Sequence, residues 1–230
     1  MHTQTKETRA SLSPADALRI LKDGNDRFSA NLKANRDLLE QVNETRDGQF
    51  PFATVLSCID SRTSAELIFD QGLGDIFSVR IAGNFLNDDI LGSLEFACHI
   101  AGAKLIVVLG HSRCGAIKGA CDKVELGHLT GLLEKLTPAV EAVVDPIDLT
   151  MRTSANGSFV DAVAAENVRR VVNAIPVQSR VLREMKLTGA IEIVGGFYDV
   201  ASGSVELLPA VMPRSASPKR AADSDRLGVS

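Results

Sequence analysis

A thiol, a carboxylate and a guanidinium stand at alternate positions in the stretch "VLSCIDSR", as Cys58, Asp60 and Arg62. A second stretch, "GHSRCG", places His111 and Cys114 three residues apart. Thiolate sulfur and imidazole nitrogen are the ligands that zinc prefers, in four-coordinate tetrahedral sites. The two stretches therefore predict a metal centre, provided that the fold brings Cys58 to His111 and Cys114. Chance placement of unrelated side chains is the alternative.

Three protein ligands would leave the fourth position of such a site for water or for the Asp60 carboxylate. This arrangement is typical of a catalytic site rather than of a closed structural one. Thiol redox chemistry is a weaker interpretation, because the sequence contains no Cys-x-x-Cys pair. The two remaining cysteines, Cys98 and Cys121, lie in helical patterns, so we expect them to be structural.

Each of the two stretches follows an apolar run of strand length. The run "FPFATVLS" precedes Cys58, and "KLIVVLG" (104–110) precedes His111; both are typical of strands covered on two faces. Helical patterns alternate with these and with further strands at "DIFSVRIAG" and "GAIEIVGGFYDV". The alternation predicts an α/β fold, with a parallel-core sheet flanked by helices. Ligands of such sheets bind at the carboxyl ends of strands, where both stretches lie.

The expected helices fall between these strands. They cover "TSAELIFDQGLG", "DDILGSLEFACHIAGA", a segment from about Arg113, a segment from about His128 to Val143, and one from about Phe159 to Met185 that Pro176 should kink or restart. An extended N-terminal helical arm begins at Ser13 and Pro14, a cap followed by a first-turn proline. A turn at Ser202 and Gly203 leads into a short final strand.

The composition bounds the domain organisation and the partners. The chain has 230 residues and 45% hydrophobic content, enough for one core. We expect a flexible N-terminus (1–12), a single domain (13–208, with the arm at 13–35) and a disordered tail (209–230). A net charge of -4 argues against a nucleic-acid partner. No apolar run suits a membrane helix or a secretory signal, so we expect a cytoplasmic protein without a membrane partner.

The paired motifs "SCIDSR" and "GHSRCG", joined by "AELIFDQGLGDIFSVRIAGN" and followed by "GGFYDVASGSV", resemble those of the β-class carbonic anhydrases. The resemblance extends from about Ser13 to Leu208. It implies a zinc enzyme that reversibly hydrates carbon dioxide to bicarbonate and a proton. One Zn²⁺ per subunit would be held by Cys58, His111 and Cys114. The family also implies a homo-oligomer, either a dimer or a dimer of dimers, in which the leading helix wraps onto a partner subunit.

The resemblance assigns further roles around the metal. Asp60 and Arg62 would be catalytic. Asp60 can also occupy the fourth metal position, and the rigid donors of Arg62 would hold it off the metal. One subgroup has a tryptophan three residues before the first cysteine, in a bicarbonate pocket that keeps the aspartate on zinc. This sequence has Val55 there and no tryptophan, so the resemblance implies an open zinc site of the bacterial type.

Four residues match substrate-binding positions of the family. Gln49, nine residues before Cys58, matches a glutamine that donates a hydrogen bond to the substrate in one subgroup, although a solvated linker is the alternative. Phe77 and Phe96 match apolar pocket positions, which carbon dioxide favours, or are plain core. Gly115 would allow close approach of the substrate.

Two thiolates cancel the formal charge of the zinc ion, which weakens it as a Lewis acid, so we expect activity to rise toward alkaline pH. Two alternative functions use the same ligands. One is hydrolysis of carbon disulfide or carbonyl sulfide. The other is zinc binding without turnover.

Overall fold

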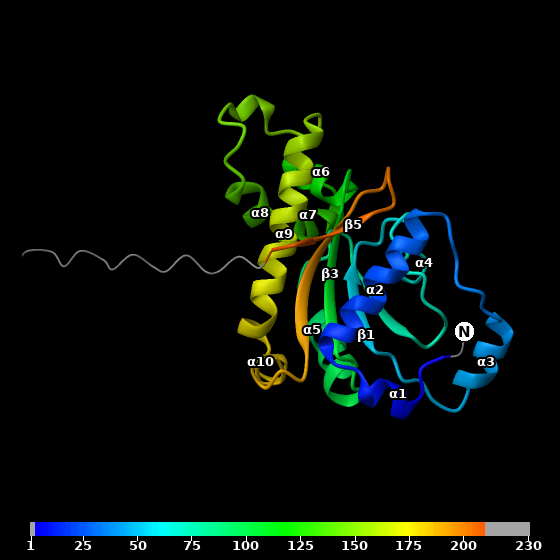
Figure 1. Cartoon of the computed structure of the whole chain (residues 1–230). Coiled ribbons are helices and arrows are strands. Elements are labelled where there is room, and N and C mark those ends of the chain that lie inside the picture. Colours follow the sequence, from blue (N-terminus) through cyan, green and yellow to red (C-terminus); the bar gives the residue numbers. More distant parts are fainter. Residues whose placement is uncertain (1–2, 210–230) are drawn as a thin grey trace, which may run out of the picture.

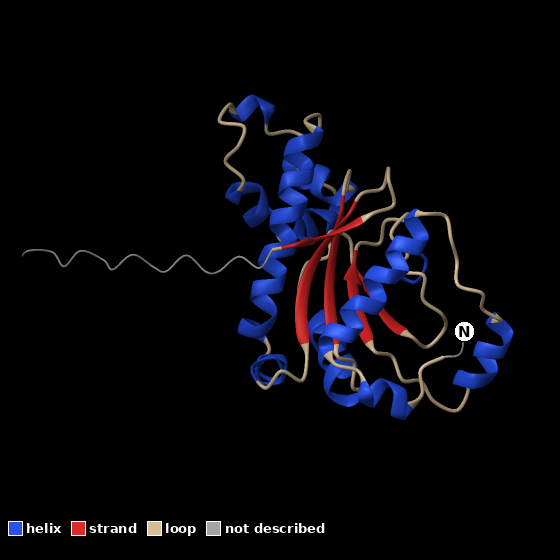
Figure 2. Ribbon diagram, viewed as in Figure 1, coloured by secondary structure: helices blue, strands red, loops and turns tan. Residues whose placement is uncertain are grey.

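The computed structural model describes residues 3–209 and contains one five-stranded sheet with helices on both faces (Figures 1 and 2). The strand order is β2-β1-β3-β4-β5. The strands are β1 (Ala53–Ser57), β2 (Ile76–Arg80), β3 (Leu105–His111), β4 (Glu192–Tyr198) and β5 (Val205–Leu208). The first four are parallel, and β5 is antiparallel to β4. The α/β fold with a parallel core and a short final strand is confirmed.

The central strands are buried because helices cover both faces of the sheet. Every residue of β1 and β3 is buried, as their continuous apolar runs predict. One face packs against α5 (Asp88–Glu95), the π-helical turn η1 (Phe96–Ile100), α9 (Gly157–Gln178) and α10 (Arg180–Leu187). The other packs against α2 (Pro14–Ser29) and α4 (Ala65–Ile68).

A third apolar cluster lies where β1 and β3 end. In it, Cys58 and Cys114 pack with apolar side chains of four helices, namely α6 (Gly115–Cys121), α7 (Gly127–Glu134), α8 (Thr137–Ala142) and the first turns of α9. A short 3₁₀ turn, η2 (Leu149–Met151), lies in the connection between α8 and α9. The predicted ligands at the carboxyl edge of the sheet are therefore surrounded by apolar side chains.

The N-terminal part has more helix than the sequence predicts. The expected helix at the start of the arm is α2, where the Ser13 side chain accepts from the Asp16 N–H and Pro14 fills the first position. Residues 6–11 also form a helix, α1 (Lys6–Ser11), capped by Thr5, within the segment for which the sequence predicts flexibility. A capping box closed between Thr5 and Thr8 supplies the local signal. Another helix, α3 (Leu38–Thr45), was not expected.

Two later helices differ from expectation in where they break. The expected helix at 128–143 is divided into α7 and α8. The long helix α9 continues through Pro176 to Gln178, and the chain restarts as α10 after Ser179. Ser179 is the N-cap of α10, and its side chain accepts a hydrogen bond from the Leu182 N–H. The restart expected at Pro176 therefore occurs at the next good capping residue.

No helix within residues 3–209 is long and apolar enough to cross a membrane. The expected tail at 209–230 lies outside the described residues except for Pro209.

Candidate metal centre

Three side chains converge at the carboxyl edge of the sheet. The ligand atoms of Cys58, His111 and Cys114 all lie within 4.8 Å of one another, and all three residues are buried. The two sulfur atoms are 3.9 Å apart. Cys58 directly follows β1, His111 is the last residue of β3, and Cys114 precedes α6. Because β1 and β3 are neighbouring parallel strands, their carboxyl ends meet, which produces the convergence that the sequence predicts.

The His111 ring is oriented by a backbone group and has one free nitrogen. Its Nδ1 lies 2.9 Å from the carbonyl oxygen of Ser112, to which an Nδ1–H donates. Its Nε2 is buried and has no hydrogen-bond partner among the described residues. A buried polar atom without a partner is costly, and a metal-ligating histidine usually donates its other N–H to a carbonyl or carboxylate. The ring therefore has the tautomer and the available lone pair that a metal ligand needs.

The two thiols favour one negative charge between them. The hydrogen bond from the Cys114 thiol lowers the pKa of Cys58, opposed by burial and helped by the Gly83 N–H, whose nitrogen is 3.4 Å from the Cys58 sulfur. Pairing with Cys58 and burial raise the pKa of Cys114. A divalent cation at this point would displace the second thiol proton, so two sulfurs and one imidazole nitrogen fit a zinc ion.

Asp60 is held outside this cluster by Arg62. The guanidinium donates from Nε to Oδ1 at 2.9 Å and from Nη2 to Oδ2 at 2.8 Å, and the Arg62 backbone N–H donates to Oδ1 at 3.0 Å. These bonds, above all those of the side chain, hold the pKa of Asp60 well below its usual range. The described cluster of possible metal ligands does not include Asp60. The structure thus places the Asp60 carboxylate on Arg62 and outside the cluster of Cys58, His111 and Cys114.

The loop after Cys58 has two anchors that sequence reasoning missed. Arg80, the last residue of β2, donates from Nε to the Cys58 carbonyl at 2.9 Å and from Nη2 to the Asp60 carbonyl at 2.6 Å. The Thr63 hydroxyl lies 3.0 Å and 2.9 Å from the same two carbonyl oxygens, and its single proton is shared between them. Arg80 stands opposite Ser57 in the strand register, so only the pairing of β1 with β2 reveals it.

Comparison with known proteins identifies the family. The sequence profile of the family described as carbonic anhydrase matches residues 53–205, which contain all three clustered side chains. A carbonic anhydrase of Mycolicibacterium smegmatis is 37% identical over 202 residues, which cover 85% of this chain and 93% of that protein. The chain belongs to the β-class carbonic anhydrase family. It is therefore an enzyme, a carbonate dehydratase.

Other relatives agree with this assignment. Carbonic anhydrase 2 of Mycobacterium tuberculosis is 36% identical over 196 residues, covering 85% of this chain and 93% of its own. The crystal structure of the β-carbonic anhydrase CafA of Aspergillus fumigatus matches with a TM-score of 0.68 and 28% identity, covering 86% of this chain and 92% of that one. These relatives favour carbon dioxide hydration over hydrolysis of carbon disulfide or carbonyl sulfide.

Of the four predicted substrate-binding residues of this carbonic anhydrase, only Gly115 lies beside the candidate metal centre within one chain. Gln49 is exposed and precedes β1, whereas Cys58 follows it; the five residues of β1 separate its ends by roughly 16 Å. Phe77 is the second residue of β2, and its ring packs against Phe96 with centroids 6.2 Å apart. Gly115 lies next to Cys114, and a Cβ there would meet nothing within 4 Å beyond its chain neighbours and the backbone of its own helix.

Proposed function

We propose that this carbonic anhydrase binds one zinc ion per subunit through Cys58, His111 and Cys114 and hydrates carbon dioxide there. The observation that carries the proposal is the buried set of two thiols and one unpartnered imidazole nitrogen within 4.8 Å. This donor set favours zinc over magnesium or calcium, which prefer oxygen ligands. A zinc ion in this position would lower the pKa of bound water and so supply a hydroxide nucleophile, in an amount that grows toward alkaline pH because two thiolates weaken the Lewis acid.

The side chains around the ion orient the reaction. Asp60 stays ionised because Arg62 holds its pKa low, so at working pH it can accept a hydrogen bond from the reacting water but cannot donate one. Its Oδ1 accepts two hydrogen bonds from Arg62 and its Oδ2 accepts one. Oδ2 therefore keeps a lone pair that can accept a hydrogen bond from the reacting water. The open space beside Gly115 gives carbon dioxide room to approach. Asp60 and Arg62 are therefore the catalytic pair.

The pairing of Asp60 with Arg62 also supports an open metal site. Val55, where one subgroup has tryptophan, is fully buried in β1. Its aliphatic side chain offers no hydrogen bond to a bicarbonate ion beside the strand. We infer that Asp60 stays off the metal at neutral pH. Sigmoidal inhibition by bicarbonate would contradict this.

A second subunit would complete the substrate pocket. Gln49, Phe77 and Phe96 lie away from the metal centre of their own chain, yet Phe96 is 52% exposed and Ile59, beside the metal ligand Cys58, is 61% exposed. Exposed apolar side chains of this kind mark interfaces. A similar crystal structure, with a TM-score of 0.63, 24% identity and coverage of 72% of this chain and 84% of that one, is described as a tetrameric β-carbonic anhydrase of Sordaria macrospora. We infer a homo-oligomer in which these three residues serve the partner's metal centre.

The thiol ligands also bear on the compartment. All four cysteines are free, and all are buried. Free thiols persist in reducing compartments, which supports the proposal that the enzyme acts in the cytoplasm.

Metal analysis of matched cysteine variants tests the proposal. The wild-type protein should contain about one zinc per subunit and hydrate carbon dioxide in a stopped-flow assay. Cys58→Ser should lose both. Cys121→Ser is the control, because Cys121 lies in α6 outside the cluster, and it should keep both. A Cys58→Ser protein with normal zinc content and turnover would overturn the proposed centre.

A further inference from the structure

The loop between the two later ligands has an unusual backbone. Ser112 and Arg113 separate His111, at the end of β3, from Cys114, at the start of α6. Arg113 has a φ of +58°, in the left-handed region that residues other than glycine rarely adopt. Such conformations persist only where the surrounding structure holds them. The direction in which Cys114 points therefore depends on what holds Arg113.

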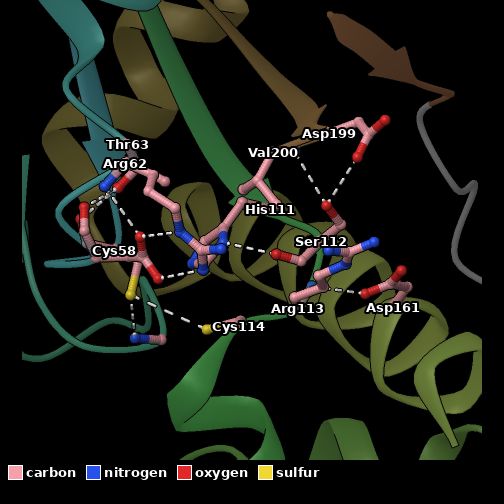
Figure 3. A network of polar contacts seen from close by, with 12 residues as sticks. Cys58, Arg62, Thr63, His111, Ser112, Arg113, Cys114, Asp161, Asp199 and Val200 are labelled. Carbon is pink, nitrogen blue, oxygen red and sulfur yellow. Dashed lines mark hydrogen bonds and ion pairs between the residues drawn. The ribbon is translucent and has the colours of Figure 1, made fainter. Parts of the chain in front are cut away.

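Two carboxylates from distant parts of the chain hold this loop. Asp161, on α9 and 48 residues away, accepts a hydrogen bond from the Arg113 backbone N–H at 2.8 Å. Asp199, which follows β4 and is 87 residues away, accepts one from the Ser112 hydroxyl at 3.0 Å. The same hydroxyl accepts from the Val200 N–H at 3.0 Å. Figure 3 shows these contacts on the side of the loop away from Cys58.

Each contact acts on one metal ligand. The Ser112 carbonyl accepts the Nδ1–H of His111 at 2.9 Å, so the position of Ser112 sets the orientation of the imidazole ring. Arg113 is directly bonded to Cys114, so its backbone angles set the direction of the second thiol. Both ligands are thus fixed from outside by groups that touch neither the metal position nor the substrate.

We propose that Asp161 and Asp199 are positioning residues that fix His111 and Cys114 for metal binding before the metal arrives. The inference rests on the proposed metal centre. Groups one step beyond the metal ligands typically change metal affinity about 10- to 100-fold when removed. Because Asp161 acts through the backbone of Arg113 rather than on a ligand atom, we expect a loss near the lower end, about tenfold.

Replacing Asp161 gives the direct test. Asp161→Ala removes the acceptor, whereas Asp161→Asn keeps an oxygen that can accept from the Arg113 N–H. Zinc affinity is measured by competition with a chromophoric chelator, and the geometry by the visible spectrum of the cobalt-substituted protein. Asp161→Ala should bind zinc about tenfold more weakly and shift the cobalt bands, and Asp161→Asn should restore both.

A matched control lies directly after α6, at its C-cap residue Asp122. Asp122 accepts a hydrogen bond from the Ser154 N–H at 2.8 Å, the same kind of bond to a loop that contains no metal ligand. Asp122→Ala should leave the zinc affinity and the cobalt spectrum unchanged. Ser112→Ala removes the hydrogen bond to Asp199 and should weaken zinc binding as Asp161→Ala does. If Asp161→Ala does not fold without metal, Ser112→Ala still tests the contact with Asp199.

The outcomes separate this inference from the proposed function. Wild-type protein that binds neither zinc nor cobalt would overturn the metal centre, and the positioning role with it. Wild-type binding together with unchanged affinity and spectrum in Asp161→Ala would overturn the role of Asp161 alone. Equal losses in Asp161→Asn and Asp161→Ala would also overturn it, because charge rather than the hydrogen bond would then be responsible. Unchanged binding in Ser112→Ala would overturn the role of Asp199.

Discussion

Removing the Arg62 side chain should release Asp60 toward the metal position. In the structure Arg62 donates to both oxygens of Asp60, at 2.9 Å and 2.8 Å. In Arg62→Ala the carboxylate keeps only the backbone N–H of residue 62 as a fixed donor from this pair. The metal ion is then the most favourable partner for the freed carboxylate, which would bind it at the open fourth position. We expect turnover to fall while the metal stays bound.

The contacts of the pair set the size of the effect. Two hydrogen bonds between charged groups are worth about 3 to 6 kcal/mol when they are well protected from water. The Arg62 side chain is 47% exposed and Asp60 is 16% exposed, so water screens the pair and reduces this to about 0.5 to 1 kcal/mol. Loss of that free energy favours the displaced carboxylate by roughly 2- to 5-fold. The decrease in kcat/KM at neutral pH should not exceed this factor.

The assay combines stopped-flow carbon dioxide hydration with zinc analysis of the same sample. The control is Arg46→Ala, which removes an ion pair with Asp47 in which both side chains are exposed; its kcat/KM should equal that of the wild type. Loss of zinc from Arg62→Ala would show that Arg62 supports the metal centre structurally. Full turnover with zinc retained would refute the idea that Arg62 controls Asp60.

Three further predictions concern stability and pH. Burial raises the pKa of Asp70, but the hydrogen bonds from Arg27 and Arg36 outweigh burial and hold that pKa below its usual value. These ion pairs therefore stabilise the folded protein above about pH 4, and the stabilisation is lost as the pH falls through the folded-state pKa of Asp70. In urea unfolding, Asp70→Asn should cost about 3 kcal/mol at pH 7, and the gap from the wild type should close in acid; a gap independent of pH would contradict the ion-pair explanation. Gly110→Ala would place a Cβ 2.5 Å from a methyl group of Val168, so it should cost about 1 to 3 kcal/mol, and Val168→Ala in the same chain should recover part of the loss. Activity should rise from pH 6 to 9 because two thiolates weaken the Lewis acid, and a flat or falling stopped-flow profile would contradict this.

The sequence predicts those parts of the fold that local patterns encode. The runs that became β1 and β3 are apolar throughout, and burial on both faces follows directly from that pattern. The ligand cluster could be predicted for the same reason, since parallel neighbours place Cys58 and His111 at one edge. The divided helix at 128–143 and the passage of α9 through Pro176 could not, because tertiary packing overrides weak local preference there.

The residues around the ligands were harder to predict because they act across the fold. Arg80 and Asp161 bond to backbone groups of the two ligand loops, and Asp199 bonds to the Ser112 hydroxyl. The bonded residues are 22, 48 and 87 residues apart in sequence. Nothing in their local pattern distinguishes them from surface charges. For Gln49 and Phe77 the situation is reversed. The family resemblance predicts them at the substrate site, whereas within one chain they lie at the amino ends of β1 and β2, away from the ligands.

The catalytic role of zinc is tested by measuring zinc content and carbon dioxide hydration together while the metal is removed and returned. We predict that hydration falls in proportion to zinc as a chelator removes the metal, and that it recovers as zinc is restored to about one ion per subunit. We also predict that Cys114→Ser recovers neither zinc nor hydration. Full hydration by zinc-free protein, or a zinc-loaded protein without hydration, would contradict a catalytic zinc at this centre.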